Sequence, residues 1–202
     1  MKRALRSAAL PLSGAICLSF ALGCAAPEGM ESPDTDDPAA DELALQDTPE
    51  TAALEPRADG TFYYIRAKHS DKCLHQHGAV FDNGAKITQW DCVDQYNVQW
   101  ELEDSPDPGY YFIKARHSGK CVHQHGATYG NGDPITQWDC VNQGNVKWRI
   151  IPAPNNYYYV QVQHSAKCLH VHGGSWDNGA AITQWDCINQ PNVLWWFDPV
   201  GH

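Results

Sequence analysis

One stretch of sequence occurs three times in this chain. The copies begin at Lys72, Lys120 and Lys167, so they are offset by 48 and 47 residues. Each copy reads Lys-Cys, Leu or Val, His-x-His-Gly, then Asn-Gly, Ile-Thr-Gln-Trp-Asp-Cys and a closing Asn-Val-x-Trp. Self-similarity at a fixed period is typical of folds in which like units bury their apolar faces against one another. We therefore expect one folded unit of three repeats, at about residues 61–104, 108–151 and 155–198.

Six of the eight cysteines lie at matching positions in the repeats. The two cysteines of each copy are 19 residues apart, and no pair has the short Cys-x-x-Cys spacing of a zinc site. An even set of cysteines in an exported protein is typical of a disulfide framework. We predict three bridges, one inside each repeat: Cys73–Cys92, Cys121–Cys140 and Cys168–Cys187.

Residues 1–24 have the order of a signal peptide. A positively charged start precedes an apolar run over 7–22, which is too short and too interrupted for a comfortable membrane span. The run ends in Ala-Leu-Gly-Cys24, which resembles a bacterial lipobox, in which the cysteine is lipidated after cleavage. The resemblance implies a chain anchored by lipid at Cys24 to the bacterial envelope or cell surface. Ordinary cleavage and secretion is the alternative.

Residues 25–60 have the composition of a disordered acidic spacer. They hold eleven Asp or Glu and one basic residue, Arg57, and they lack aromatic side chains. Such a segment cannot bury enough apolar surface to order itself, so we expect it to hold the folded domain away from a membrane. Residues 61–202 hold thirteen acids and ten bases. A domain without a basic field is an unlikely binder of nucleic acid.

Four β-rich runs separated by turn residues recur in every repeat. In the first copy they cover residues 62–66, 73–77, 87–90 and 98–102, with Asn-Gly between the second and third runs as a hairpin signal. No sustained helical period occurs, so an all-β fold of twelve strands is predicted. We expect one shared core made of Trp100, Trp148, Trp195, Ile87, Ile135 and Ile182.

With these motifs the sequence resembles the ricin-type lectin family, also called carbohydrate-binding module family 13. The resemblance covers residues 61–198 and rests on the Ser-Gly-Lys-Cys start at 118–121, the Asn-Gly turn, the Gln-Trp-x-Cys segment and the closing Asn-x-x-Trp. It implies a β-trefoil that binds glycans. Two features depart from the family: Val98 and its equivalents replace the Gln of Gln-x-Trp, and His75 and its equivalents replace an Asp that grips sugar hydroxyls.

The resemblance also implies which residues bind sugar. The stacking position is occupied by Trp90, Trp138 and Trp185. The hydrogen-bonding Asn corresponds to Asn97, Asn145 and Asn192, and the substituted Asp to His75, His123 and His170. The hairpin aromatics Phe81, Tyr129 and Trp176 could add a wall. The alternatives are packing for the tryptophans and turn formation for the asparagines.

Nine of the ten histidines fall into three sets along the sequence. The sets are His69/His75/His77, His117/His123/His125 and His164/His170/His172. Three interpretations stay open: hydrogen bonding to sugar, a zinc-type metal site or a structural role. Should the second histidine of each set bind sugar, we expect binding to change with pH as the ring titrates near its ordinary value of about 6.5.

The repetition itself bears on function. Catalytic sites are asymmetric, whereas here every notable residue recurs with the same neighbours, so we expect no enzyme and no cofactor. Threefold repetition suits multivalent binding of glycans by a monomer. The alternatives are a trefoil without sugar binding that serves as a protein-interaction or structural module, and a histidine-based metal-binding surface protein.

Overall fold

The structure of the protein is a computed structural model, and it describes residues 55–201. The β-rich runs form four strands in each repeat, as expected. Repeat one contains β1 (Phe62–Ala67), β2 (Cys73–Gln76), β3 (Ile87–Trp90) and β4 (Trp100–Asp104). Repeat two contains β5 (Tyr111–Ala115), β6 (Cys121–Gln124), β7 (Ile135–Trp138) and β8 (Trp148–Ala153). Repeat three contains β9 (Tyr157–Val162), β10 (Cys168–Val171), β11 (Ile182–Trp185) and β12 (Trp195–Pro199).

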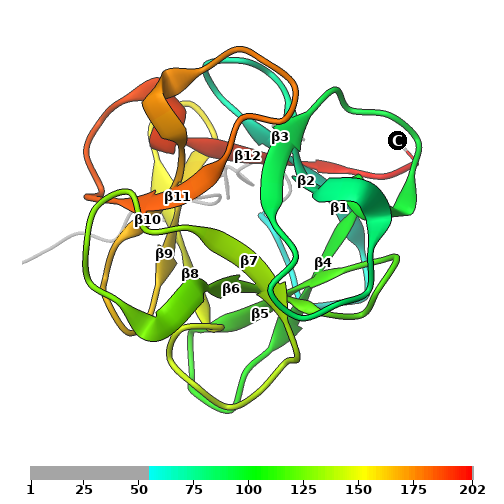
Figure 1. The fold of residues 1–202 in the computed structure, drawn as a ribbon, viewed down its shortest axis with the longest axis vertical. Coiled ribbons are helices and arrows are strands. Elements are labelled where there is room, and N and C mark those ends of the chain that lie inside the picture. The colour runs from blue at the N-terminus through cyan, green and yellow to red at the C-terminus, as the bar shows by residue number, and fades with distance from the viewer. Residues whose placement is uncertain (1–54, 202) are drawn as a thin grey trace, which may run out of the picture. The chain divides into compact units, whose positions relative to one another are not determined.

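The strands close around a threefold axis. Antiparallel pairs join successive repeats, β4 with β5 and β8 with β9, and the pair β1–β12 closes the ring. The second and third strands of each repeat form a hairpin of their own, β2–β3, β6–β7 or β10–β11. Viewed down the axis, the three repeats form three similar lobes (Figure 1). This is the β-trefoil that the sequence predicts.

The core lies where the three repeats meet. The three closing tryptophans and the three isoleucines of the Ile-Thr-Gln-Trp segments are at most 1% exposed and belong to one cluster. Each tryptophan also satisfies its ring nitrogen, as in Trp100, whose Nε1 donates to the carbonyl of Leu74 at 2.8 Å. The corresponding bonds of Trp148 and Trp195 are 2.8 and 2.9 Å long. The predicted core is therefore confirmed. Its tryptophans also hold the second strand of every repeat through these hydrogen bonds.

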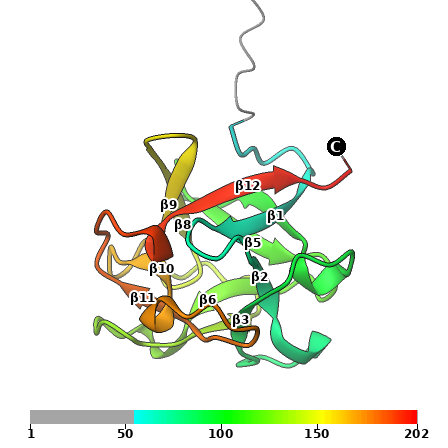
Figure 2. The same cartoon turned by 90° about the horizontal axis from the view of Figure 1, so that it is seen from above.

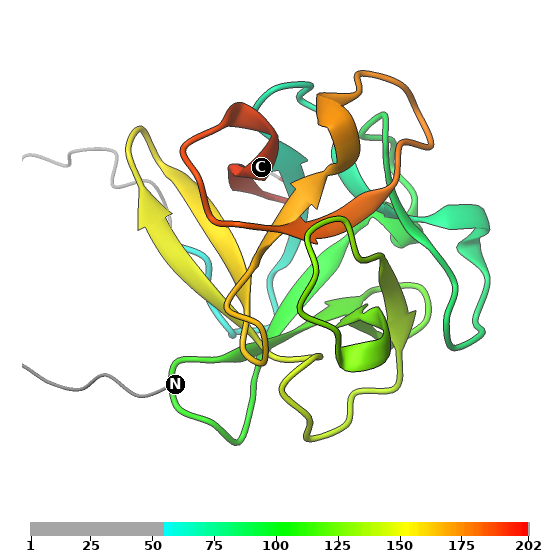
Figure 3. The same cartoon turned by 60° about the vertical axis from the view of Figure 1, so that its left-hand side comes forward.

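The three hairpins contact one another around the axis. Isolated bridges join Lys86 to Thr136, Pro134 to Thr183 and Thr88 to Ala181, so each hairpin touches both others. In the view from above, the strands β1, β9 and β12 lie at one end and the hairpins at the other (Figure 2). Each hairpin carries a short 3-10 turn directly after its first strand (Figure 3). These turns are η1 (His77–Ala79), η3 (His125–Ala127) and η4 (His172–Gly174).

The predicted strand boundaries and the predicted hairpin turn differ in part from the structure. The second strand stops at Gln76, because His77 opens η1, and the fourth strand begins at Trp100, because Val98 ends the turn η2 (Tyr96–Val98). Its counterpart in repeat three is η5 (Pro191–Val193). The Asn-Gly pair does not close a tight two-residue hairpin. It lies within the long connection of residues 77–86, where Gly84, with φ of +85°, donates its N–H to Gln137 of the next repeat at 2.8 Å.

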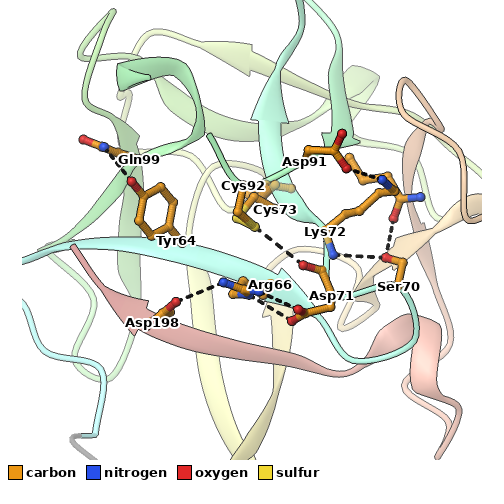
Figure 4. The surroundings of a disulfide bond; sticks show 12 residues. Tyr64, Arg66, Ser70, Asp71, Lys72, Cys73, Asp91, Cys92, Gln99 and Asp198 are labelled. Carbon is orange, nitrogen blue, oxygen red and sulfur yellow. Dashed lines mark hydrogen bonds and ion pairs between the residues drawn. A yellow bond between two sulfur atoms is a disulfide. The ribbon is translucent and has the colours of Figure 1, made fainter. Parts of the chain in front are cut away.

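The three predicted disulfides are confirmed. Cys73–Cys92, Cys121–Cys140 and Cys168–Cys187 have Cα–Cα distances of 5.1, 5.2 and 5.1 Å. Figure 4 shows the first bridge beside an ion-pair cluster in which Arg66 contacts Asp71 and Asp198 at 2.5 and 3.1 Å. Each bridge ties the start of a hairpin's first strand to the segment that follows its second strand.

The domain begins before residue 61. Glu55, which the sequence analysis assigned to the spacer, accepts a hydrogen bond from Tyr158 at 3.1 Å, and Ala58 packs against the core. The signal segment, Cys24 and most of the predicted spacer lie outside the described residues. No helix within residues 55–201 is long and apolar enough to cross a membrane.

Candidate functional site

A pocket opens on the outer side of repeat one, where the hairpin meets the segment before β4. Its volume is about 480 Å³, and an equivalent pocket of about 370 Å³ lies in repeat three. The first is lined by His75, His77, Gly78, Ala79, Trp90, Gln95 and Asn97. The second is lined by His170, His172, Gly173, Trp185, Ile188, Gln190 and Asn192. The predicted His, Trp and Asn of one repeat are thus brought together from β2, β3 and η2.

The floor of the pocket is a buried hydrogen-bonded triad. His75, which is only 8% exposed, places its Nδ1 2.9 Å from Thr88 Oγ1 and its Nε2 2.9 Å from Asn97 Nδ2. Asn97 Nδ2 also donates to the carbonyl of Gln76 at 3.0 Å. Because this amide nitrogen is the donor in both contacts, His75 Nε2 accepts, and its Nδ1–H donates to Thr88. Both ring nitrogens of His75 are therefore engaged inside the protein.

The same triad occurs in the other two repeats. His123 lies 2.9 Å from both Thr136 and Asn145. His170 lies 2.9 Å from both Thr183 and Asn192. We name the three triads the floor: His75, Thr88, Asn97; His123, Thr136, Asn145; and His170, Thr183, Asn192. Asn97 and Asn192 lie in the turns η2 and η5, as the turn interpretation predicts, and every asparagine of the floor also contacts a histidine.

Burial keeps the floor histidines neutral. Desolvation, reinforced by the neighbouring His77 and His117, lowers the pKa of His75 from 6.5 to about 4. Burial has the same effect on His123 and His170, whose pKa values also fall to about 4. The expectation that these rings titrate near 6.5 is therefore wrong. A histidine without a free ring nitrogen also cannot replace the carboxylate of the family in accepting sugar hydroxyls.

The pocket tryptophans stand between two repeats. The ring of Trp90 lies against His75, with centroids 5.3 Å apart and planes tilted by 35°. This ring also packs against Gly179, in the hairpin of repeat three: a Cβ atom at that glycine would lie only 3.8 Å from Trp90 Cζ3. Trp90 is half-buried and lines the pocket. It therefore combines packing with an accessible surface, and the same holds for Trp185.

The histidine sets read from the sequence do not match the sets in space. His117 of repeat two, not His69, lies beside the pocket of repeat one, where its Nε2 donates to the carbonyl of Val80 at 3.2 Å. His164 makes the equivalent bond to Thr128 of repeat two, at 2.7 Å, and His69 the bond to Ser175 of repeat three, at 2.9 Å. The first histidine of each predicted set thus serves the preceding repeat around the ring, because the hairpins reach across the boundary.

The metal interpretation lacks a suitable cluster. No group of three or more His, Cys, Asp or Glu side chains among residues 55–201 is arranged to hold a metal ion. Both ring nitrogens of each floor histidine are hydrogen-bonded to Thr and Asn. The Nε2–H of the first histidine in each set donates to a backbone carbonyl. Neither carboxylate nor thiolate lines the two described pockets.

Glutamine is a pocket residue that was not predicted from the sequence. Gln95 and Gln190 line the two pockets and are exposed. The sequence does contain a signal for this position, because Gln recurs two residues before the asparagine in every copy, at Gln95, Gln143 and Gln190.

The predicted aromatic wall is largely open to solvent: Phe81, Tyr129 and Trp176 are 64%, 69% and 67% exposed.

Comparison with known proteins adds a family and several structural relatives. The model described as ricin-type beta-trefoil lectin domain-like matches residues 53–138, 97–185 and 144–202. No curated protein sequence matches significantly. The designed threefold symmetric protein ThreeFoil is similar, with 31% identity, a TM-score of 0.66, and coverage of 68% of this chain and 97% of that one.

Two natural structures are also similar. The exo-β-1,3-galactanase 1,3Gal43A from Clostridium thermocellum shares 27% identity with a TM-score of 0.68, over 72% of this chain and 32% of its own. This chain therefore spans about a third of that enzyme. The Macrolepiota procera ricin B-like lectin, solved with lactose, has 16% identity and a TM-score of 0.62, over 71% of this chain and 99% of its own. At that identity the likeness shows the fold alone.

Proposed function

The chain belongs to the ricin-type β-trefoil lectin domain-like family, and from this premise we propose that it binds glycans through shallow pockets, one in each repeat. The observation that supports the proposal most is the pocket of repeat one, which recurs in repeat three with the same His, His, Gly, Trp, Gln and Asn types. A half-buried tryptophan beside a few polar groups is the usual composition of a sugar site, because sugars have an apolar C–H face and polar edges.

The hydrogen bonds within the protein determine which polar atoms of the pocket remain free to contact a sugar. Asn97 spends its amide hydrogens on His75 and Gln76, so its Oδ1 remains to accept a bond from a sugar hydroxyl. Gln95 and His77 are exposed at the rim and offer both donors and acceptors. Trp90 supplies the apolar surface. Asn145 with Trp138, and Asn192 with Trp185, have the same roles in the other repeats.

The floor histidines contribute to binding by positioning. In our proposal His75 lines the pocket with its ring and holds Asn97 so that Oδ1 is presented to the ligand. His123 and His170 do the same for Asn145 and Asn192. A single amide oxygen replaces the two carboxylate oxygens of the family's Asp, so each site should bind weakly. Three linked weak sites then gain strength on a polyvalent glycan through effective concentration.

Galactose-containing glycans are the first ligands to test. The galactanase relative, at 27% identity, covers 72% of this chain and is named for its action on β-1,3-galactan. We propose that this domain contacts such a polymer as a monomeric binding module and without catalysis, through neutral side chains. Export of the chain, with lipid attached at Cys24 and residues 25–54 as spacer, would present the pockets outside the cell.

One alternative has an observation in its favour. The floor histidines are fully engaged, and a trefoil that had exchanged sugar binding for protein binding would still keep exposed aromatics such as Phe81 and Trp176. Such a module would bind a protein and show no response to sugars.

A glycan array of the full-length chain, run with and without a chelator, tests the proposal. We expect signals on galactose-containing glycans that the chelator does not change. Replacing Trp90→Ala should remove one site of three and lower the stoichiometry measured by titration calorimetry with lactose, whereas Trp90→Phe should retain it. An array with no response to any glycan would reject sugar binding and favour the protein-binding module. A signal lost in chelator would favour the metal interpretation.

A further inference from the structure

The loop that follows each pocket is held rigidly, although its tip is exposed. In repeat one the carbonyl of Val80 accepts bonds from Gln137 Nε2 at 2.8 Å and from His117 Nε2 at 3.2 Å. Gln137 Nε2 also donates to the carbonyl of Asp82 at 3.0 Å. At the end of the loop, Asn83 donates to Asp139 at 2.7 Å. These four side-chain bonds all come from contacts with repeat two, so the next repeat helps to fix the loop of the preceding one.

The aromatic at the tip of this loop is the exception to the rigid packing. Phe81 remains 64% exposed, with only one ring, that of His117, packed against it at 5.4 Å. Tyr129 and Trp176 are 69% and 67% exposed, and they have the same relation to His164 at 5.2 Å and His69 at 5.6 Å. An aromatic that is left two-thirds in water contributes little to folding. A rigid aromatic surface on a held loop is instead well prepared for a ligand, because little conformational entropy remains to be lost.

The histidines beneath these aromatics orient the loop through Nε2. The second ring nitrogen, Nδ1, of His69, His117 and His164 is buried and has no hydrogen-bond partner among residues 55–201. An apolar ring would avoid the cost of that unpaired atom. The group that distinguishes histidine here is Nε2, which fixes the loop carbonyl. Burial lowers the pKa of His117, which favours the neutral ring that donates from Nε2.

The aromatic tip closely follows the pocket lining along the chain. Gly78 and Ala79 line the pocket of repeat one, and Phe81 follows two residues later on the same held loop. His117 packs on Phe81 and lies close enough to His75 on the pocket floor to influence that ring. No charged side chain occurs between His77 and Phe81. The occupant that suits an uncharged aromatic surface adjoining a sugar pocket is a further unit of the same glycan.

We propose that each repeat carries a second saccharide subsite, formed by its hairpin aromatic and oriented by the histidine of the next repeat. Phe81 with His117, Tyr129 with His164, and Trp176 with His69 make the three subsites. The inference rests on the proposed function, because the subsite extends the pocket. Its consequence is selection by length: a glycan chain that continues beyond the first sugar gains a stacking contact, and a monosaccharide does not.

Titration of the full-length chain with galactose and with β-1,3-galactotriose tests the proposal. The trisaccharide should bind about three- to tenfold tighter, the range expected for one aromatic contact. The triple variant Phe81→Ser, Tyr129→Ser and Trp176→Ser should lose this advantage and keep its galactose affinity within about twofold, since the variant leaves the pocket itself intact. Tyr96→Ser is the matched control, because Tyr96 is an exposed aromatic, 56% exposed, that packs under Arg116. This control should keep the trisaccharide advantage.

A second variant tests the orienting histidines. His69→Phe, His117→Phe and His164→Phe together keep a ring beneath each aromatic but remove the bond to the loop carbonyl. Hydrogen exchange of the amides at residues 80–83 should become faster, and the trisaccharide advantage should shrink while galactose affinity holds. Equal affinities for both sugars in the parent, or an advantage that survives the triple serine variant, would overturn the subsite and leave the proposed function standing. A parent that binds neither sugar would overturn both as stated for galactosides.

Discussion

The floor and the rim of the pockets follow different rules. In all three repeats the floor is the same His, Thr and Asn triad, and its two ring-nitrogen contacts are 2.9 Å long in every copy. The rim keeps its histidine (His77, His125, His172) and its glutamine (Gln95, Gln143, Gln190) in every repeat, but its loop differs. The loop carbonyl belongs to Val80, Thr128 or Ser175, and the aromatic is Phe81, Tyr129 or Trp176.

This contrast distinguishes the residues that maintain the fold from those that we propose select the ligand. The floor side chains are buried, apart from the half-buried Asn192, and the histidines bond only to groups of the floor, so a change there disturbs packing and leaves unpaired groups. The rim side chains are exposed, so they vary at little cost to folding. We therefore assign presentation of the Asn oxygen to the floor and discrimination among glycans to the rim.

Acidification should affect the floor most. The folded-state pKa of His75, His123 and His170 is about 4, below the ordinary 6.5. Between those values the unfolded chain binds more protons, so stability is complete above about pH 6.5 and falls as the pH drops toward 4. At pH 5 the loss should be about 1–2 kcal/mol for each histidine. Urea unfolding at pH 8 and pH 5 measures it.

Two features narrow the acid test, to which the half-buried His117 adds a loss of the same sign because burial also lowers its pKa. Lysine partners lower the pKa of Asp91, Asp139 and Asp186 from the ordinary 3.8, so the stability from these pairs is lost only at more acidic pH. The rim variant His77→Gln, His125→Gln and His172→Gln should keep most of the loss between pH 8 and pH 5, because desolvation is a larger cause of the lowered floor pKa values than these neighbours. If the loss disappeared in that variant, the pH response would belong to the rim and the division would fail.

Truncating the core beneath the floor should have the next largest effect. Trp148 is fully buried and donates to the carbonyl of Val122, next to His123. Trp148→Ala should lower the free energy of unfolding by about 3–5 kcal/mol. Tyr129→Ala, on the rim of the same repeat, should change it by less than about 0.5 kcal/mol. Denaturant unfolding of both variants makes the comparison, and similar losses in the two would contradict it.

Removing one partner of a floor histidine should have a smaller effect. Thr136→Val keeps the shape of the side chain and leaves the Nδ1–H of His123 buried without an acceptor, at a cost of about 1–3 kcal/mol. The matched rim change His125→Ala should stay within about 0.5 kcal/mol. The free energy of unfolding at pH 8 measures both. An unaffected Thr136→Val would mean that the triad does not hold His123 as described.

The sequence predicted what depends on local pattern. Twelve strands, three bridges and the shared tryptophan core follow from alternation, constant spacing and repetition. It did not predict partners across repeat boundaries. His117 stands near His123 in the sequence, yet the hairpin geometry places it beside Phe81 of the preceding repeat. The low pKa of His75 could not be predicted either, because it results from burial in the folded chain. The hydrogen bonds of His75 to Thr88 and Asn97 also do not follow from any sequence motif.

The central claim is that sugar enters the pockets, and the tryptophan indole signals test it directly. In a ¹H–¹⁵N spectrum of the full-length chain, the Nε1–H groups of Trp90 and Trp185 report on the two described pockets, and that of Trp138 reports on the proposed site of repeat two. Those of Trp100, Trp148 and Trp195 report on the core, because they are bonded to backbone carbonyls. Titration with lactose should shift the pocket signals in a saturable manner and leave the core signals in place. Pocket signals that stay fixed up to saturating sugar, or six signals that shift alike, would contradict glycan binding at these sites.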